Sequence, residues 1–388
     1  MNPEDHRLVT GSADLDTLVE RSLEHDVYAL DTEFHREKTY FPQLALVQLR
    51  VGDELVLIDP LEVDIKPLAA LLDSDATGVF HAASQDLEVL YRSCGTVPKV
   101  LFDTQIAAGF LGMSSPSLAA LHEREIGIRL PKGDRLTDWL RRPLGTRQLN
   151  YAASDVAHLL TIHTQLVSQL RELGRVEWAM AECELMRIKD QAPREPALAW
   201  LRIKEARHLS GPARGVAQAV AEWREQTAAD QDLPPRYILS DLAVVGVAQQ
   251  QPTTGKGLKA IRGLDERHAR GDVGESLLSL IQEGVTRNPP KPPRRGSAEL
   301  DRNLRPLVGL VTAWLGQRAR DLKLDPSLLA TRADVEAALR GDEGRLSTGW
   351  RAELVGSGIE HMRSGEASVA FERTGRLCLE RRSHESLE

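Results

Sequence analysis

The chain of 388 residues carries a net charge of −8 at pH 7 and contains three cysteines. This length exceeds that of one ordinary domain and predicts two or three. The cysteines form no CxxC pair, which argues against a zinc site or a disulfide framework. No apolar run reaches ~18 residues and the first residues lack the layout of a signal peptide, so we expect a cytoplasmic protein without a membrane segment. The acidic balance does not exclude nucleic-acid chemistry, because an enzyme whose carboxylates bind metal ions needs positive charge only locally.

The first half of the chain alternates between strand and helix patterns. Strands are expected at 27–33, 44–50, 54–59 and 78–82, with a hairpin turn at 51–53. Helices are expected at 15–23, 65–72, 84–93, 104–111, 117–126 and 146–173. Ser84 is expected to cap the helix that it opens. An antiparallel set of strands followed by crossover helices predicts a mixed-sheet α/β domain.

The second half has helical patterns and contains an internal repeat. A shift of 91 positions, without gaps, aligns one copy with the other. It pairs Trp223 with Trp314, Gln226 with Gln317, Leu233 with Leu324, Pro235 with Pro326 and Ser240 with Thr331. Duplicated helical domains explain this pattern. Between the copies, the four prolines and four basic residues of segment 287–296 predict a stiff, solvated linker.

Two carboxylates end the strand expected at 27–33. Asp31 and Glu33 are two residues apart, so in a strand they share one side while Thr32 points away. Carboxylates held side by side repel each other, and a hard cation relieves that repulsion. An isolated Asp-x-Glu is common and often marks only a turn or a cap, so further residues are needed to indicate a metal site.

Three further residues complete such a pattern. Asp86 lies at a strand-to-helix junction, although an acid there can also simply favour the first turn of a helix. Tyr151 and Asp155 are four residues apart and stack on one helix face, although a tyrosine in a helix is often a half-buried core residue. The ordered combination of Asp-x-Glu, Asp and Tyr-x-x-x-Asp indicates a metal-dependent site.

These segments resemble the three exonuclease motifs of the DEDD superfamily, in its tyrosine-bearing branch, and specifically the ribonuclease D family. The similar segments are 31–34, 39–44, 47–49, 80–82, 86–90, 103–105, 137–140 and 151–156. The repeat resembles a pair of HRDC domains, which are helical nucleic-acid-binding modules. The resemblance implies an α/β ribonuclease-H-like exonuclease domain, a mixed sheet flanked by helices, followed by two all-α HRDC-like domains. The expected parts are the exonuclease domain 1–175, a helical connector 176–204, HRDC-like domains 205–286 and 297–388, and the linker 287–296.

The resemblance also implies an activity. It predicts a 3′-5′ exoribonuclease that trims single-stranded 3′ ends of RNA, such as tRNA precursors, to nucleoside 5′-monophosphates with two divalent ions, Mg²⁺ or Mn²⁺. Asp31 would bridge the ions, Glu33 and Asp155 would complete the shell of one, and Asp86 would act on the other. Tyr151 would orient the attacking water, because a tyrosine with an ordinary pKa near 10 is a poor base.

Contacts with the nucleic acid are expected at two places. Near the acids, the candidates are Thr32, Phe34, His81, Lys132 and Arg135. A satisfied strand-end histidine and a solvated basic loop are the alternatives for the last three. In the first helical copy, the candidates are Lys256, Lys259 and Arg262, for which a solvated charged face is the alternative.

The second copy has many acids, and Ala352-Glu353-Leu354 lies opposite Ile261-Arg262-Gly263. Packing against the catalytic domain is therefore an equal alternative to nucleic-acid binding by this copy. A 3′ exonuclease acting on single-stranded DNA and a non-catalytic nucleic-acid tether remain alternative functions. A monomer is expected by default.

Overall fold

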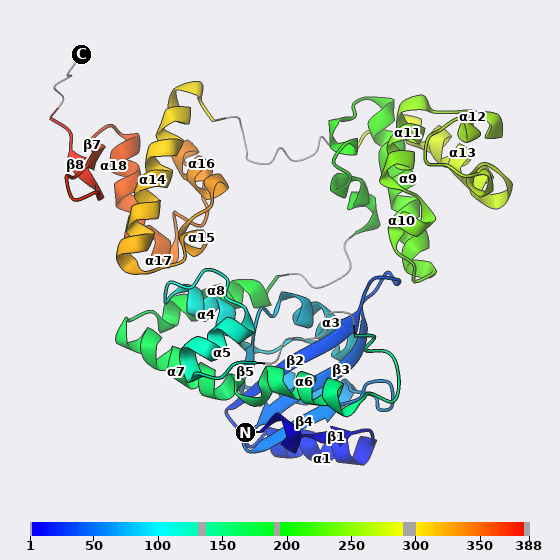
Figure 1. Cartoon of the computed structure of the whole chain (residues 1–388). Coiled ribbons are helices and arrows are strands. Elements are labelled where there is room, and N and C mark those ends of the chain that lie inside the picture. The colour runs from blue at the N-terminus through cyan, green and yellow to red at the C-terminus, as the bar shows by residue number, and fades with distance from the viewer. Residues whose placement is uncertain (1, 131–136, 190–194, 290–299, 384–388) are drawn as a thin grey trace.

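A six-stranded mixed sheet forms the centre of the first half of the chain (Figure 1). The computed structural model describes residues 2–130, 137–189, 195–289 and 300–383. The strands are β1 Arg7–Val9, β2 Val27–His35, β3 Gln43–Val51, β4 Glu54–Ile58, β5 Thr77–Phe80 and β6 Val100–Asp103, in the order β1-β4-β3-β2-β5-β6. The pairs β2–β3 and β3–β4 are antiparallel, whereas β1–β4, β2–β5 and β5–β6 are parallel. The predicted mixed-sheet α/β class is confirmed.

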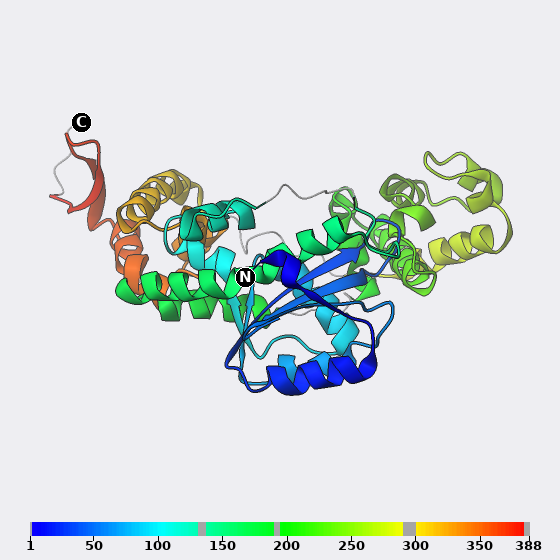
Figure 2. The same ribbon diagram turned by 60° about the horizontal axis from the view of Figure 1, so that its bottom comes forward.

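Helices cover both faces of this sheet, so its central strands are buried on both sides. One face packs against α1 Ser12–Ser22 and α3 Ser84–Cys94, and the other against α6 Thr146–Ala157 and α7 Leu159–Glu172. Figure 2 shows the blue α1 on one side of the strands and the green helices α6 and α7 on the other. The remaining helices of this half are α2 Ala69–Leu72, α4 Thr104–Gly109, α5 Leu118–Ile126 and α8 Val176–Arg187.

Several local expectations for this half were wrong. The helix expected over 146–173 is two helices, because the backbone leaves helical geometry at His158 (φ −115°, ψ 1°). Ala83, not Ser84, is the N-cap of α3, and no side-chain cap bond forms there. The strands β1 and β6 were not predicted, since three or four residues are too few to show an alternating pattern.

The second half contains two helical copies, as the repeat predicted. The first consists of α9 Pro212–Asp230, α10 Pro235–Ile238, α11 Asp241–Gln250, α12 Gly255–Lys259 and α13 Gly271–Thr286. The second consists of α14 Arg305–Leu322, α15 Pro326–Leu329, α16 Arg332–Arg340, α17 Gly349–Arg351 and α18 Ser357–Arg363. Short 3₁₀ segments accompany them, η3 Pro196–Arg202 and η4 Ala206–His208 before the first copy and η6 Arg302–Leu304 before the second.

Paired residues of the repeat make the same contacts in both copies. The Gln226 amide donates to Asp230 at 2.9 Å, and the Gln317 amide donates to Asp321 at 2.8 Å. Ser240 and Thr331 both cap the helix that follows, each accepting a backbone N–H with its hydroxyl. The repeat in the sequence is therefore a repeat in structure.

The second copy ends in an element that the helical pattern did not predict. Strands β7 Ala367–Phe371 and β8 Leu377–Arg381 form an antiparallel hairpin after α18. Gly375, with φ +85°, lies in the turn between them and adopts a conformation that other residues rarely do. The expectation of helices holds for the rest of this copy.

The two helical copies differ in whether their hydrophobic core is separate from that of the catalytic domain. The first copy has its own core, which includes Trp200, Val220 and Val247. The second copy shares one core with the catalytic domain, in which Trp350 packs with Phe110. The second copy packs against the catalytic domain, as one of the two alternatives expected, and nucleic-acid binding by this copy stays a prediction. Residues 290–296 of the predicted linker lie outside the described residues, and the proposed domain boundaries stay predictions.

Candidate active site

The acids singled out in the sequence lie where β2 and β5 end at the same edge of the sheet. β2 and β5 are parallel, so the end of β2, with Asp31 and Glu33, lies near the turn that leads from β5 into α3 and Asp86. Helix α6 packs across β2, β3 and β4 and carries Asp155. Asp86 is only 6% exposed, whereas Asp31, Glu33 and Asp155 are partly exposed.

The four carboxylates interact electrostatically. Burial raises the pKa of Asp31 well above its ordinary value, and the charges of Asp86, Asp155 and Glu33 raise it further. Burial and the charges of Asp155 and Asp86 raise the pKa of Glu33 to about 8. Burial raises the pKa of Asp86 and that of Asp155 to about 7 each. The four acids therefore form one cluster that carries more negative charge than its surroundings favour.

Divalent cations suit this cluster. The donor atoms are all carboxylate oxygens, which match Mg²⁺ or Mn²⁺ rather than zinc. Within the described residues, no three Asp, Glu, His or Cys side chains already converge as ligands of one ion. The acids are therefore neighbours whose charges interact, and a cation would relieve the repulsion that raises the pKa values of Asp31 and Glu33.

Two polar residues hold Asp86 in place. The Thr32 hydroxyl donates to the Asp86 carboxylate at 2.5 Å, and Thr32 is 6% exposed. The fully buried Asp103 accepts the backbone N–H groups of Ala82 (3.2 Å) and Ala83 (2.8 Å), directly before α3. Ala82 has a φ of 60°, which an alanine rarely adopts, so these bonds stabilise an unusual turn. Asp103 belongs to one of the segments similar to the exonuclease motifs, but no local pattern indicates this role, because its partners lie about twenty positions away.

Tyr151 lies one turn before Asp155 on α6. Its ring stacks on that of Trp139, with centroids 6.2 Å apart and an interplanar angle of 29°. A cavity of about 1020 Å³ opens beside this pair, and its lining also includes Arg147, Asn150 and His158. Tyr151 therefore lies on the same helix as Asp155 and lines a large cavity.

The other predicted contact residues have different surroundings. Phe34 follows a register shift in β2 and packs partly buried against the core beneath α3. The Nδ1 atom of His81 lies 3.0 Å from the Thr104 hydroxyl, and burial lowers the pKa of His81. This side chain is thus satisfied within the protein. Lys132 and Arg135 lie outside the described residues.

The basic residues of the first copy lie on α12 and the turn after it, in a different domain from the acids (Figure 1). Lys256, Lys259 and Arg262 are all exposed. Lys259 forms an ion pair with Glu266 at 2.9 Å. Nucleic-acid contacts by these residues, and by Thr32, Phe34 and His81, stay predictions.

Comparisons with known proteins assign the family. A family model described as 3′-5′ exonuclease matches residues 6–171, and a model of the HRDC domain matches residues 213–281. The chain is 36% identical to ribonuclease D of Zymomonas mobilis over 375 residues, which cover 94% of this chain and 95% of that protein. It is 34% identical to ribonuclease D of Nitrobacter hamburgensis, over 97% of this chain and all of that protein.

A solved structure agrees with these matches. The crystal structure of Escherichia coli RNase D superimposes with a TM-score of 0.82 at 32% identity, covering 93% of this chain and 99% of that one. Sequence and fold therefore agree over nearly the whole length, and both parts of the predicted architecture are present. The chain belongs to the ribonuclease D family of 3′-5′ exoribonucleases, whose catalytic domain is of the DEDD type.

Proposed function

We propose that Asp31, Glu33, Asp86 and Asp155 bind two divalent ions, Mg²⁺ or Mn²⁺, and that the enzyme removes nucleoside 5′-monophosphates from the 3′ end of RNA. The observation that carries this proposal is the cluster of four carboxylates at one edge of the sheet: burial raises the pKa of each, and the charges of the other acids further raise those of Asp31 and Glu33. Bound ions would activate the attacking water and stabilise the departing 3′ oxygen.

The chain's own residues have distinct parts in this proposal. Thr32 holds Asp86 through the hydroxyl bond of 2.5 Å, so that this carboxylate keeps one orientation. Tyr151 orients the attacking water, and its ring is held by Trp139. The cavity of about 1020 Å³ that Tyr151 and Trp139 line is at the upper end of the size range of ligand pockets and receives the terminal nucleotides.

The proposed substrates are RNAs with single-stranded 3′ ends, tRNA precursors in particular. The crystal structure of the E. coli relative is described as that of an exoribonuclease involved in structured RNA processing, and its similarity over 93% of this chain supports an RNA substrate here. The exposed basic residues around α12 support phosphate contacts by the first copy.

The proposed enzyme acts as a monomer in the cytoplasm. One chain supplies all four carboxylates and Tyr151, so the reaction needs no residue from a second copy. In the part of the chain that the structure describes, no helix is both long and apolar enough to cross a bilayer.

Digestion of matched substrates tests the proposal. A tRNA with an extended 3′ trailer and a single-stranded DNA of equal length, both labelled at the 5′ end, are incubated with Mg²⁺ or Mn²⁺. The expected result is a ladder that shortens from the 3′ end on RNA and disappears with EDTA or in Asp155→Ala. Asp53→Ala removes an acid whose side chain is fully exposed and should leave the ladder unchanged.

Two results would contradict the proposal. Equal shortening of the DNA would indicate a general 3′ exonuclease. Binding of RNA without any shortening would leave a nucleic-acid tether and remove the catalytic role of the acids.

A further inference from the structure

Gln48 in the middle of β3 is fully buried, yet neither its Nε2 nor its Oε1 atom has a hydrogen-bond partner among the described residues. In that part of the chain it is the one buried side chain with two such atoms, because every other case involves a single atom. Burying an amide without partners costs free energy that an apolar side chain of similar size does not. Packing alone therefore does not explain a glutamine here.

The strand register places Gln48 beside the acids. Gln48 is directly opposite Asp31 in the antiparallel pair β2–β3, so both side chains point to the same face of the sheet. Glu33 is the diagonal neighbour on that face. Leu57 lies opposite on β4 and Leu46 lies two positions away along β3, and both are fully buried and apolar.

On that face of the sheet, the neighbours of Gln48 on β2 therefore include the carboxylates of Asp31 and Glu33, with Asp31 directly opposite. The next polar residue along β3 is Arg50, which lies on the same face. Its Nη1 atom already donates to the Glu54 carbonyl at 3.1 Å.

We propose that Gln48 is a positioning residue for Asp31, its amide N–H donating to the Asp31 carboxylate when that carboxylate binds divalent ions. An amide is suited to this place because it donates a hydrogen bond without changing the charge of the cluster. A lysine or arginine would compete with the cations, and a glutamate would add a fifth negative charge. The inference rests on the divalent-ion site proposed above.

Thermal unfolding of the full chain, followed with EDTA and during titration with Mn²⁺, tests this role without measuring activity. Gln48→Met removes the amide and keeps a buried side chain of similar length. The melting temperature in EDTA should stay the same or rise, because two unsatisfied atoms are removed. The Mn²⁺ concentration that gives half of the stabilisation should rise about 10–100-fold, as expected when a residue that orients a metal ligand is removed.

Two further variants sharpen the test. Gln317→Met in the second helical copy is the matched control, since Gln317 is also buried but is bonded to Asp321. It should lower the melting temperature in EDTA and leave the Mn²⁺ dependence unchanged. Gln48→Glu keeps the shape and an oxygen but loses the N–H, so it should weaken Mn²⁺ binding as Gln48→Met does.

The results that overturn the inference are distinct. An unchanged Mn²⁺ dependence in Gln48→Met would show that the amide does not position a ligand. Tighter Mn²⁺ binding by Gln48→Glu would show that the oxygen, not the N–H, is the working atom. If the wild-type protein itself showed no stabilisation by Mn²⁺, the divalent-ion site would be refuted, and the role of Gln48 with it.

Discussion

The two helical copies have the same order of helices but contact the catalytic domain in different ways. The first copy contacts it through polar groups at one loop. The Tyr40 hydroxyl donates to Glu225 at 2.7 Å, and Asp232 accepts the backbone N–H groups of Tyr40 and Phe41, both at 3.1 Å. The core of this copy remains its own.

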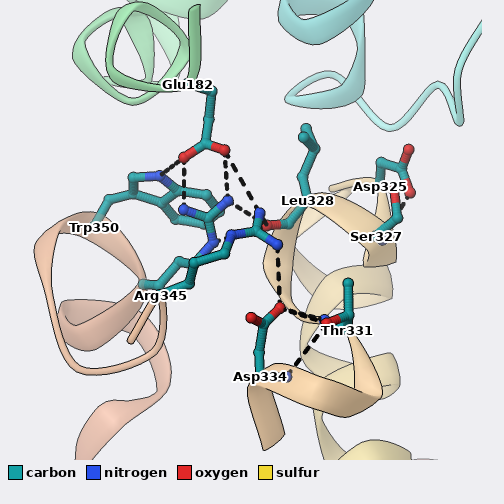
Figure 3. Close-up of polar contacts among 9 residues, drawn as sticks. Glu182, Asp325, Ser327, Leu328, Thr331, Asp334, Arg345 and Trp350 are labelled. Atoms are coloured by element: carbon teal, nitrogen blue, oxygen red, sulfur yellow. Dashed lines mark hydrogen bonds and ion pairs between the residues drawn. The ribbon is translucent and has the colours of Figure 1, made fainter. Parts of the chain in front are cut away.

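The second copy is joined to the catalytic domain through buried side chains. Trp350 lies against Trp178 and Phe110, with ring centroids 5.3 and 5.2 Å apart. Glu182 of α8 accepts two hydrogen bonds from Arg351, at 2.6 and 2.7 Å, and a third from Trp350 at 3.2 Å (Figure 3). Although burial alone raises the pKa of Glu182, the bonds and charge of Arg351 lower it below its usual range.

Arg175, at the start of α8, adds a polar link between the same two parts. Its guanidinium donates to the Phe110 carbonyl of the catalytic domain and, at 2.6 Å, to the Leu322 carbonyl of the second copy.

The repeat shows which residue differences between the two copies accompany their different contacts with the catalytic domain. The ungapped alignment places Trp350 and Arg351 opposite Lys259 and Ala260. Lys259 and Ala260 are exposed, whereas Trp350 and Arg351 are 6% and 4% exposed. The positions that are exposed in the first copy are thus buried in the second, so their side chains are not accessible there.

Breaking the buried ion pair should have the largest effect on stability. Arg351→Met removes the two shortest hydrogen bonds of the buried Glu182 carboxylate, which among the described residues keeps only Trp350 at 3.2 Å and an ion pair with Arg345 at 3.6 Å. The free energy of unfolding should fall by about 3 kcal/mol. Urea denaturation measures this loss. Arg363→Ala, which removes an exposed pair with Glu360, is the control and should cost at most about 0.5 kcal/mol. Equal losses in the two variants would mean that the second copy is not held by this contact.

The pH dependence of the stability between about pH 4 and 8 should come from the carboxylates of the catalytic domain rather than from either copy. The folded-state pKa values of Glu33, Asp86 and Asp155 are about 7–8, above the ordinary values near 4. The folded protein therefore binds more protons than the unfolded chain within this window, so metal-free stability should fall as the pH rises from about 4 to 8.

Ion binding should have the opposite pH dependence. Divalent ions need deprotonated carboxylates, so their apparent affinity should rise between about pH 6 and 8 and then level off. Melting temperatures measured with EDTA and with Mg²⁺ at several pH values separate the two trends. An unchanged pH dependence in Asp31→Asn would place its origin outside the cluster.

Weakening the contact between the first copy and the catalytic domain should lower the free energy of unfolding by a smaller amount. Tyr40→Phe removes the hydroxyl that donates to the buried Glu225, which keeps its ion pair with Arg202. We expect a loss of about 1–2 kcal/mol in urea denaturation. Amide hydrogen exchange at Tyr40 and Phe41 should become faster, since the loop is held less firmly. A loss as large as that of Arg351→Met would remove the contrast between the copies.

The smallest stability effect is expected at the exposed basic residues of the first copy. Replacing Lys256 and Arg262 by alanine should change the free energy of unfolding by less than about 0.5 kcal/mol. RNA binding should weaken, and the slope of log K against log salt should fall by about 1 for each phosphate that the protein no longer neutralises. Fluorescence anisotropy at several salt concentrations measures both. Arg373→Ala, at an exposed position of the second copy, is the control, and an equal effect there would assign RNA binding to both copies.

Much of the architecture follows from local patterns in the sequence. Alternation along one strand placed Asp31 and Glu33 on one side, and helical spacing placed Tyr151 and Asp155 on another element. The repeat predicted two equivalent helical copies, and its aligned residues Ser240 and Thr331 cap equivalent helices. These features were predictable because each depends on residues a few positions apart.

The tertiary structure decided what depends on distant partners. Glu182 and Arg351 are 169 positions apart, so no local pattern could show which copy docks. The role proposed for Gln48 depends on the register of β3 against β2, which places it opposite Asp31. The sequence by itself determined the chemistry of the site and the repeat, because spacing along one element is enough for both. Which side chains support the site, and which copy stays exposed, required the packing of elements that only the folded chain brings together.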